Sequence, residues 1–305
     1  MHSNYEWCLL RGCKFDVRIY LSNSGSQDCQ KESPVNYKKK IFYLLLFMGL
    51  LWVAGLFGSR FTPHDPLVIR LDERLSPPSC VYIFGTDELG RDIFSRVMVG
   101  FSNTMKVSIM ALFSSLFIGV IFGSIAGMFY GTLIDRAFNW ITAMLFSLPF
   151  LLIVAAVMSI MEKSLLNAYL VITAVIWVSP ARIIRAGVIK TKSAGFVLTE
   201  RAMGMEEWKI LIRSLIPMSI HPAFIFTFRY FPEIIGLEAG LSFLGLGVQP
   251  PYPGLGKMIF DSINYLYSAW WYALFPASIL FSIVCICNIF HKYVLERKEH
   301  GLMEV

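Results

Sequence analysis

The chain has 305 residues, of which 56% are hydrophobic and 16% are charged, and its mean hydropathy is +0.59. Soluble domains carry about 25% charged residues, so this composition argues against an ordinary cytosolic enzyme and excludes a disordered or fibrous chain. Basic residues outnumber acidic residues by 27 to 21, a net charge of +6. In a membrane protein such an excess is typical of cytoplasmic loops and does not indicate a nucleic-acid partner. The six cysteines and five histidines are scattered, so no metal site, cofactor site or disulfide framework is predicted.

Long uncharged stretches predict where the chain crosses a bilayer, because a spanning helix needs about 20 mostly apolar residues. The sequence predicts an all-α membrane protein with six transmembrane helices, at residues 41–59, 107–134, 137–161, 164–181, 214–237 and 262–290. Three glycines in the second span, Gly119, Gly123 and Gly127, recur at the spacing that allows close helix packing. Residues 239–256 also lack charge, but their glycines and prolines predict a loop or a re-entrant turn.

Basic residues beside the spans predict the orientation of the chain. Lys38, Lys39 and Lys40 precede the first span and place the N-terminus in the cytoplasm, and six spans then return the C-terminus to the same side. The expected organisation is a cytoplasmic tail at 1–40, a first transmembrane helix at 41–59, an extracytoplasmic loop with a short amphipathic helix at 60–103, a five-helix core at 104–290 that includes a cytoplasmic segment at 182–217, and a cytoplasmic tail at 291–305.

Residues 182–217 are longer than a simple connection needs, and they are patterned. Apolar residues recur at helical spacing as far as Met203, and Gly204 then interrupts them as a left-handed helix cap would. Glu206 and Glu207 suit the first turn of a second helix, which Pro217 is expected to close. Two short helices hinged at a glycine predict either a rigid element that fits a partner's groove or an amphipathic segment on the membrane surface.

The segment GMEEWKILIRSLIP, from Gly204 to Pro217, resembles the C-terminal part of the EAA loop of bacterial ABC-importer permeases. FGTDELGRDIFSRV (84–97) and EAGLSFLGLGVQPPYPGLGKM (238–258) look like signatures of the dipeptide/oligopeptide permease family, specifically its OppC/DppC-type subunit. The Glu-Ala-Ala that names the loop falls on Leu198, Thr199 and Glu200, so its first acidic residue is missing. The coupling loop that the resemblance implies contains Leu198, Thr199, Glu200, Ala202, Gly204, Glu206, Glu207 and Pro217.

This resemblance implies the MetI-like architecture of an ABC-importer permease in the bacterial inner membrane, surrounded by lipid. It implies a subunit that moves dipeptides or oligopeptides by alternating access together with a second permease subunit. Two cytoplasmic ATPase subunits would bind the coupling loop, and an extracytoplasmic solute-binding protein would deliver the peptide. The chain itself is expected not to be an enzyme: GLGK at 254–257 is no P-loop, since Pro251 and Met258 replace the residues that a P-loop needs.

Charged residues within and beside the spans are the candidates for lining a transport pathway. A charge inside a span costs about 3 kcal/mol unless it is paired or hydrated, so Arg229 and Glu233 are expected to face a partner or a cavity. Their spacing predicts a mutual ion pair, although both could also lie in water or serve helix association. Glu238 is a third candidate, at the outer end of the fifth span.

The charged stretch 84–97 predicts a short helix with ion pairs Asp87–Arg91 and Asp92–Arg96. It is interpreted either as a brace of the permease pair or a contact with the binding protein, or as a solvated amphipathic helix parallel to the membrane surface.

Two other functions remain open at the level of sequence. The same architecture could carry nickel, glutathione or another small solute. A secondary transporter coupled to an ion gradient would instead need carboxylates in several spans and inverted repeats.

Overall fold

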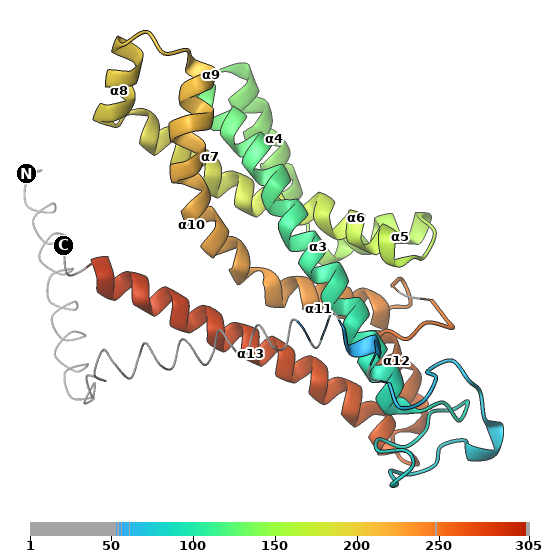
Figure 1. The fold of residues 1–305 in the computed structure, drawn as a ribbon. Helices are drawn as coiled ribbons and strands as arrows, with labels where there is room; N and C mark the ends of the chain where they lie inside the picture. The colour runs from blue at the N-terminus through green and yellow to red at the C-terminus, as the bar shows by residue number, and fades with distance from the viewer. Residues whose placement is uncertain (1–52, 54, 56, 61, 248, 303–305) are drawn as a thin grey trace, which may run out of the picture. The chain divides into compact units, whose positions relative to one another are not determined.

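The fold is described by a computed structural model that covers residues 53, 55, 57–60, 62–247 and 249–302, with side chains as far as residue 289 (Figure 1). Within these residues the secondary structure is helical, apart from one isolated bridge between Thr86 and Asp92. The all-α prediction is therefore confirmed. The predicted tail at 1–40 and nearly all of the predicted first span at 41–59 lie outside the described residues.

The helices follow one another with short connections. They are α3 (Ile93–Met128), α4 (Leu133–Ser147), α5 (Phe150–Ile160), α6 (Leu165–Ile176), α7 (Val178–Lys192), α8 (Gly195–Ala202), α9 (Glu207–Ile210), the π-helix η3 (Leu211–Leu215), α10 (Ile216–Arg229), α11 (Phe231–Phe243), α12 (Leu255–Ser262) and α13 (Trp270–Leu302). Short 3-10 turns lie at η1 (Gly58–Arg60), η2 (Leu71–Glu73) and η4 (Ile263–Tyr265).

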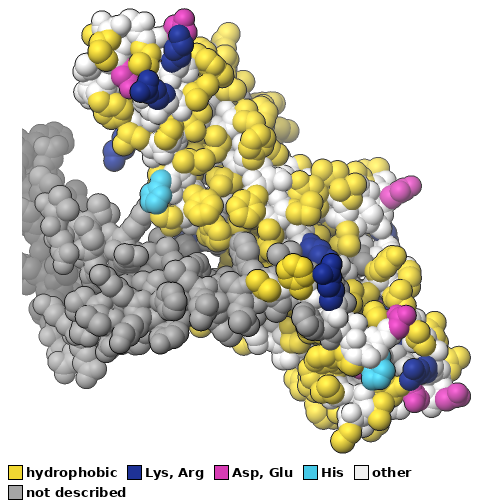
Figure 2. Space-filling view, viewed as in Figure 1, with side chains coloured by type: hydrophobic (Ala, Val, Ile, Leu, Met, Phe, Trp, Pro, Cys, Tyr) yellow, Lys and Arg dark blue, Asp and Glu magenta, His cyan; other side chains and the backbone are white. Residues whose placement is uncertain are grey.

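Four helical stretches of the described chain are long and apolar enough to cross a membrane, and α4 with α5 makes a fifth if that bent pair is one span. The four are Ile93–Met128, Leu165–Lys192, Glu207–Arg229 and Trp270–Ile289. Figure 2 shows a largely apolar surface between charged groups that gather mainly at the two ends of this face. The second, fourth, fifth and sixth predicted spans each correspond to one of these stretches.

The third predicted span, 137–161, is not one straight helix. The axes of α4 and α5 meet at 89°. Pro149 explains the break, because a proline disfavours helical geometry in the residue before it. Leu148 accordingly has extended backbone angles, with φ −103° and ψ 143°.

Two other predicted boundaries are corrected by the structure. Pro217 does not close a helix, because α9, η3 and α10 form one continuous helical stretch. The π turn widens the helix just before the proline, and the N–H of Ile216 donates to the carbonyl of Leu211, five residues back. Residues 239–256 are not wholly a loop, since α11 extends to Phe243 and α12 begins at Leu255.

The prediction of a helix at 84–97 is also wrong for residues 84–92. Residues 84–92 form turns, and helix begins only at Ile93, as the start of α3. Asp92 is the N-cap, where its side chain accepts a hydrogen bond from the N–H of Ser95 at 3.1 Å. The 36 residues of α3 make a helix about 54 Å long, which exceeds the roughly 30 Å hydrocarbon core of a bilayer.

The glycines of α3 allow it to lie directly against α7. A Cβ on Gly119 would lie 2.9 Å from the backbone N of Ala181, and one on Gly127 would lie 2.8 Å from Cβ of Val188. A Cβ on Gly123 would press against the carbonyl oxygen of Ala181, which is backbone and cannot turn aside. The prediction of close helix packing along this glycine row is confirmed.

We therefore expect Gly123→Ala to lower the thermal unfolding temperature of the detergent-purified protein. The added methyl group must displace α7, and overpacking of this kind costs about 1–3 kcal/mol. The matched control is Gly236→Ala on α11, where nothing lies within 4 Å of the added Cβ. Equal unfolding temperatures for Gly123→Ala and wild type would contradict the close-packing account.

Candidate functional site

Gly204 forms the hinge between α8 and α9. Its φ is +80°, in the left-handed region that favours glycine. Its N–H donates to the carbonyl of Arg201 at 2.9 Å, and the N–H of Met205 donates to the carbonyl of Glu200 at 3.1 Å. Nothing lies within 4 Å of where a Cβ would be, so the requirement for glycine is conformational and not steric. The predicted left-handed cap is confirmed.

Two polar contacts brace this hinge. The hydroxyl of Ser214 donates to the carboxylate of Glu200, with Oγ 2.7 Å from Oε1 and 2.9 Å from Oε2. The guanidinium of Arg201 makes a two-pronged contact with Glu207, at 2.5 Å from Nε to Oε1 and 2.9 Å from Nη2 to Oε2. Both contacts join α8 to the helix that follows Gly204, so they hold the angle between the two helices.

Sequence analysis identified Glu200 but missed Ser214, its partner. The two residues are 14 positions apart. A serine within an apolar helix carries no distinctive signal, and only the turn at Gly204 brings it to Glu200.

We call residues 195–217 the hinged pair. Its buried face consists of Val197, Ile210, Leu211 and Leu215, which join a hydrophobic cluster with α3 and α7. Its outer face is exposed and partly apolar, with Trp208 63% and Leu198 53% exposed. Glu200 is half-buried, and the other predicted coupling residues are exposed, namely Leu198, Thr199, Ala202, Gly204, Glu206, Glu207 and Pro217.

The hinged pair thus combines a firmly packed base with an apolar, solvent-facing surface. Exposed apolar residues of this kind make the hinged pair a candidate interaction site. It lies at the C-terminal end of α3, opposite the end that carries residues 62–92 (Figure 1).

A second candidate region is an apolar pocket of about 210 Å³. It lies where three helix breaks come together: α4 to α5, α6 to α7, and α10 to α11. Its lining residues are Leu145, Phe146, Leu148, Phe150, Val175, Ile176, Val178, Ser179, Tyr230 and Glu233. Sequence analysis identified Glu233 but none of the aromatic walls, because these come from α4, from α5 and from the junction of α10 with α11. We call this cavity the break pocket.

The structure separates Arg229 from Glu233. Arg229 ends α10 and Glu233 lies in the first turn of α11, with Tyr230 at the junction. Both side chains are exposed. The predicted ion pair does not form in the described part of the chain. Residues four positions apart face each other on one continuous helix, and here the helix is interrupted at Tyr230.

Glu238 occupies a different environment. Its side chain is buried, and it accepts hydrogen bonds from Thr104 (Oγ1 to Oε2, 2.5 Å) and from Ser242 (Oγ to Oε1, 2.9 Å). Thr104 belongs to α3, so this carboxyl group joins α11 to α3. It is not among the residues that line the break pocket.

The charged residues of 84–97 are buried rather than solvated. Asp87, with no exposed surface, accepts from Nε of Arg91 at 2.7 Å and pairs with Nε of Arg96 at 3.2 Å. The expected pair Asp87–Arg91 is confirmed, although on a turn and not on a helix. Asp92 caps α3, and its neighbour is His64, whose Nδ1 lies 3.5 Å from Oδ2.

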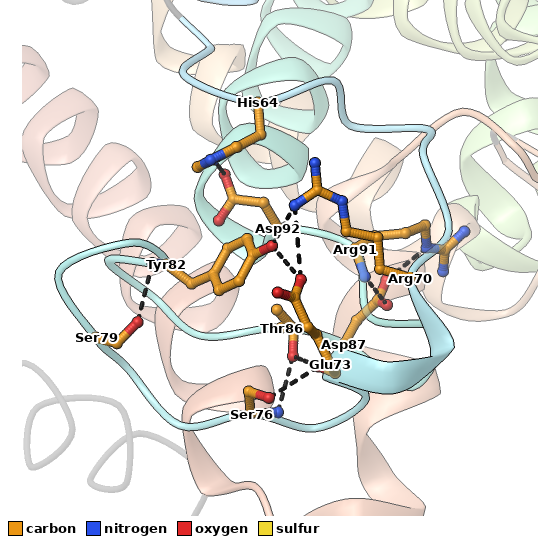
Figure 3. Close-up of polar contacts among 10 residues, drawn as sticks. All are labelled: His64, Arg70, Glu73, Ser76, Ser79, Tyr82, Thr86, Asp87, Arg91 and Asp92. Carbon is orange, nitrogen blue, oxygen red and sulfur yellow. Dashed lines mark hydrogen bonds and ion pairs between the residues drawn. The ribbon is translucent and has the colours of Figure 1, made fainter.

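A polar network holds the preceding loop in place (Figure 3). Nη1 of Arg70 donates to the hydroxyl of Tyr82 at 2.6 Å, and that hydroxyl donates to Glu73. The carbonyl of Pro66 accepts from Nη1 of Arg96 at 3.1 Å. These contacts fasten residues 62–92 onto the first turn of α3, so the interpretation of 84–97 as a solvated surface helix is wrong.

Comparison with known proteins gives a consistent result. The model of the family described as binding-protein-dependent transport system inner membrane component matches residues 119–300. The chain is 36% identical to the dipeptide transport system permease protein DppC of Bacillus subtilis, over 77% of this chain and 72% of that protein. It is 33% identical to the oligopeptide permease protein OppC of the same organism, over 77% of each.

A glutathione transport system permease protein, GsiD of Pectobacterium atrosepticum, is 31% identical over 80% of this chain and 81% of the relative. Among solved structures, a chain of the MetNI methionine ABC transporter in an inward-facing form superposes with a TM-score of 0.52. The superposed region covers 66% of this chain and 95% of the MetNI chain, and the two sequences are 17% identical. At that identity the likeness shows the fold alone, and it confirms the expected MetI-like architecture.

We expect Ser214→Ala to loosen the hinge without unfolding the protein. The substitution removes the donor to Glu200, so amide hydrogen exchange in α8 should accelerate while the thermal unfolding temperature changes little. The control is Ser193→Ala, because the hydroxyl of Ser193 donates only to the carbonyl of Lys190, one turn back. Unchanged exchange in α8 would show that the Ser214–Glu200 contact does not brace the hinge.

Glu88 provides a test by pH. Burial, with the neighbouring carboxylates of Asp261 and Asp87, raises the pKa of Glu88 above its ordinary value. An acid whose pKa is raised by folding destabilises the folded state once it is ionised. Glu88→Gln should therefore raise the unfolding temperature at neutral pH, and this gain should shrink as the pH falls through the raised pKa. Asp72→Asn, at an exposed position, is the control; a gain for Glu88→Gln that does not depend on pH would contradict the electrostatic explanation.

Proposed function

This chain belongs to the family of binding-protein-dependent transport system inner membrane components, and we propose that it carries peptides across the membrane by a lever action of the hinged pair. Its relatives are permease subunits of dipeptide and oligopeptide transport systems, and the chain is a multi-pass membrane subunit of the same kind. The relatives are transport subunits, which are not themselves enzymes. ATP hydrolysis is accordingly assigned to ATPase partners.

One observation supports the lever above all others: the hinged pair is continuous with a transmembrane helix. The stretch Glu207–Arg229 begins directly after the hinge and is long and apolar enough to span the bilayer. A displacement applied to α8 and α9 therefore moves one end of a spanning helix. A flexible loop at this position would absorb the same displacement.

The braces make this lever stiff. Glu200–Ser214 and Arg201–Glu207 hold α8 to the following helix, while the buried face packs on α3 and α7. We propose that the exposed residues Leu198 and Trp208 lie in the contact with an ATPase subunit. The missing acid at the first position of the Glu-Ala-Ala motif is then compensated by Glu200, which braces the hinge from within.

The assembly that this mechanism needs has further members. A second permease subunit, two cytoplasmic ATPase subunits and an extracytoplasmic solute-binding protein complete an importer of the expected type. The hinged pair and both termini then lie on the cytoplasmic side, and residues 62–92 lie on the opposite side. The proposed topology keeps the order of the segments expected from sequence and the side of the membrane assigned to each, and α13 is helical through most of 291–305.

We propose that the pathway passes the break pocket, with Arg229 and Glu233 on its wall. Both side chains are exposed at the same helix junction. Glu238 is the third candidate lining residue. Because it accepts hydrogen bonds from Thr104 of α3 and Ser242 of α11, we assign it the role of holding α11 against α3.

Glutathione is the second candidate cargo, because a glutathione permease subunit is 31% identical to this chain. Glutathione is itself a peptide, so the two candidates share the same chemistry. Uptake of radiolabelled dipeptides, longer peptides and glutathione by proteoliposomes that contain the whole complex would distinguish them.

We expect Gly204→Val to abolish ATP-dependent peptide uptake by such proteoliposomes while the protein still inserts and assembles. A β-branched residue cannot adopt φ +80° without strain, so the hinge angle changes. The control is Gly195→Ala, at the start of α8, where the backbone is helical and nothing lies within 4 Å of the added Cβ. Normal uptake by Gly204→Val would refute the lever.

A further inference from the structure

We infer that the break pocket binds the ammonium end of a peptide, with the Glu233 carboxylate as the counter-charge. This inference rests on the proposed peptide-import function and names the part of the substrate that the pocket holds.

The charge of Glu233 lacks a partner within the chain. Among the residues that the structure describes, no basic side chain is paired with Glu233, and the remaining pocket residues are apolar except for Ser179 and Tyr230. The N-terminal dipole of α11 offsets part of the charge, because Glu233 lies in its first turn. A carboxylate on the wall of an apolar cavity between spanning helices still favours a cationic occupant.

The size of the pocket limits what can enter. About 210 Å³ is smaller than the roughly 300–1,000 Å³ that encloses a drug-sized ligand. One residue of a peptide fits this space better than the whole molecule does. The rings of Phe146, Phe150 and Tyr230 offer π faces to an ammonium group and apolar surface to the first side chain.

The guanidinium of Arg182, which stacks on a ring of the pocket wall, favours a zwitterionic occupant. Cζ of Arg182 lies 4.3 Å from the ring centroid of Phe146, on the face of a residue that lines the pocket. A purely cationic ligand would be repelled by Arg182. A peptide can place its ammonium group towards Glu233 and direct its carbonyls or its carboxylate towards Arg182.

The location of Glu233 also couples the occupant to the lever. From the hinge, the chain runs through α9, η3 and α10 to the junction at Tyr230, and Glu233 follows in the first turn of α11. Three helix breaks surround the pocket, so a tilt of α10 alters its shape. Movement of the hinged pair can thereby open or close the ammonium site.

The test uses the complete transporter in proteoliposomes and a dipeptide whose first residue is the photoreactive amino acid photoleucine, which is close to leucine in size. Irradiation during ATP-driven uptake should label the pocket wall, at Phe150 or Tyr230, in the wild-type complex. Glu233→Gln should lower this labelling and raise the half-saturating peptide concentration about tenfold, and Glu233→Asp should restore most of both. Glu162→Gln is the matched control, since Glu162 is exposed in the connection between α5 and α6.

Four results would overturn the inference. If the wild-type complex imports the peptide but is labelled elsewhere, or if Glu233→Gln behaves as wild type, the ammonium site is wrong and the proposed function stands. If Glu233→Gln dissociates the complex, Glu233 pairs with a neighbouring subunit instead of a peptide. If the wild-type complex imports neither this peptide nor an unmodified one, the proposed function itself fails.

Discussion

The close contact between α3 and α7 is the interaction on which the rest of the structure depends. Gly119, Gly123 and Gly127 bring the two backbones together, and any side chain at these positions would separate them. In a bilayer, helices associate by such packing because lipid supplies little hydrophobic driving force. The same two helices form the base of the hinged pair, through a shared cluster of buried residues. In the proposed mechanism the lever moves against this packed base.

The second organising feature is the continuity of the chain from Gly204 to the break pocket. The stretch Glu207–Arg229 remains whole although it contains Pro217, which directly follows a π turn and Ile216. Its break comes only at Tyr230, beside the cavity. Continuous helix leads from the surface that a motor would push to the cavity that a substrate would enter.

Three carboxylates of this protein, namely Asp87, Glu238 and Glu233, differ in their environment. Asp87 and Glu238 are buried and fully engaged, Asp87 by two arginines and Glu238 by two hydroxyl groups. Burying a charge is costly unless partners satisfy it, so these residues serve the architecture. Glu233 is exposed and has no cation beside it among the described residues. Environment thus separates two carboxylates that hold the helices together from Glu233, which we propose as the ligand's counter-charge.

The sequence by itself determined the features that depend on local chemistry. Hydropathy identified the all-α membrane class, the need for a positive φ identified Gly204, and the charge of Glu233 identified it as a candidate site residue. Tertiary structure decided the features that depend on contacts between residues far apart in the sequence. It also decided those for which two local preferences disagree. The buried turn at 84–92, the partnership of Ser214 with Glu200, and the aromatic walls of the break pocket all depend on such meetings. The prolines show the same limit: Pro149 lies at the break between α4 and α5, whereas Pro217 and Pro222 lie within the continuous stretch Glu207–Arg229, so the local preference of a proline does not by itself decide where a helix ends.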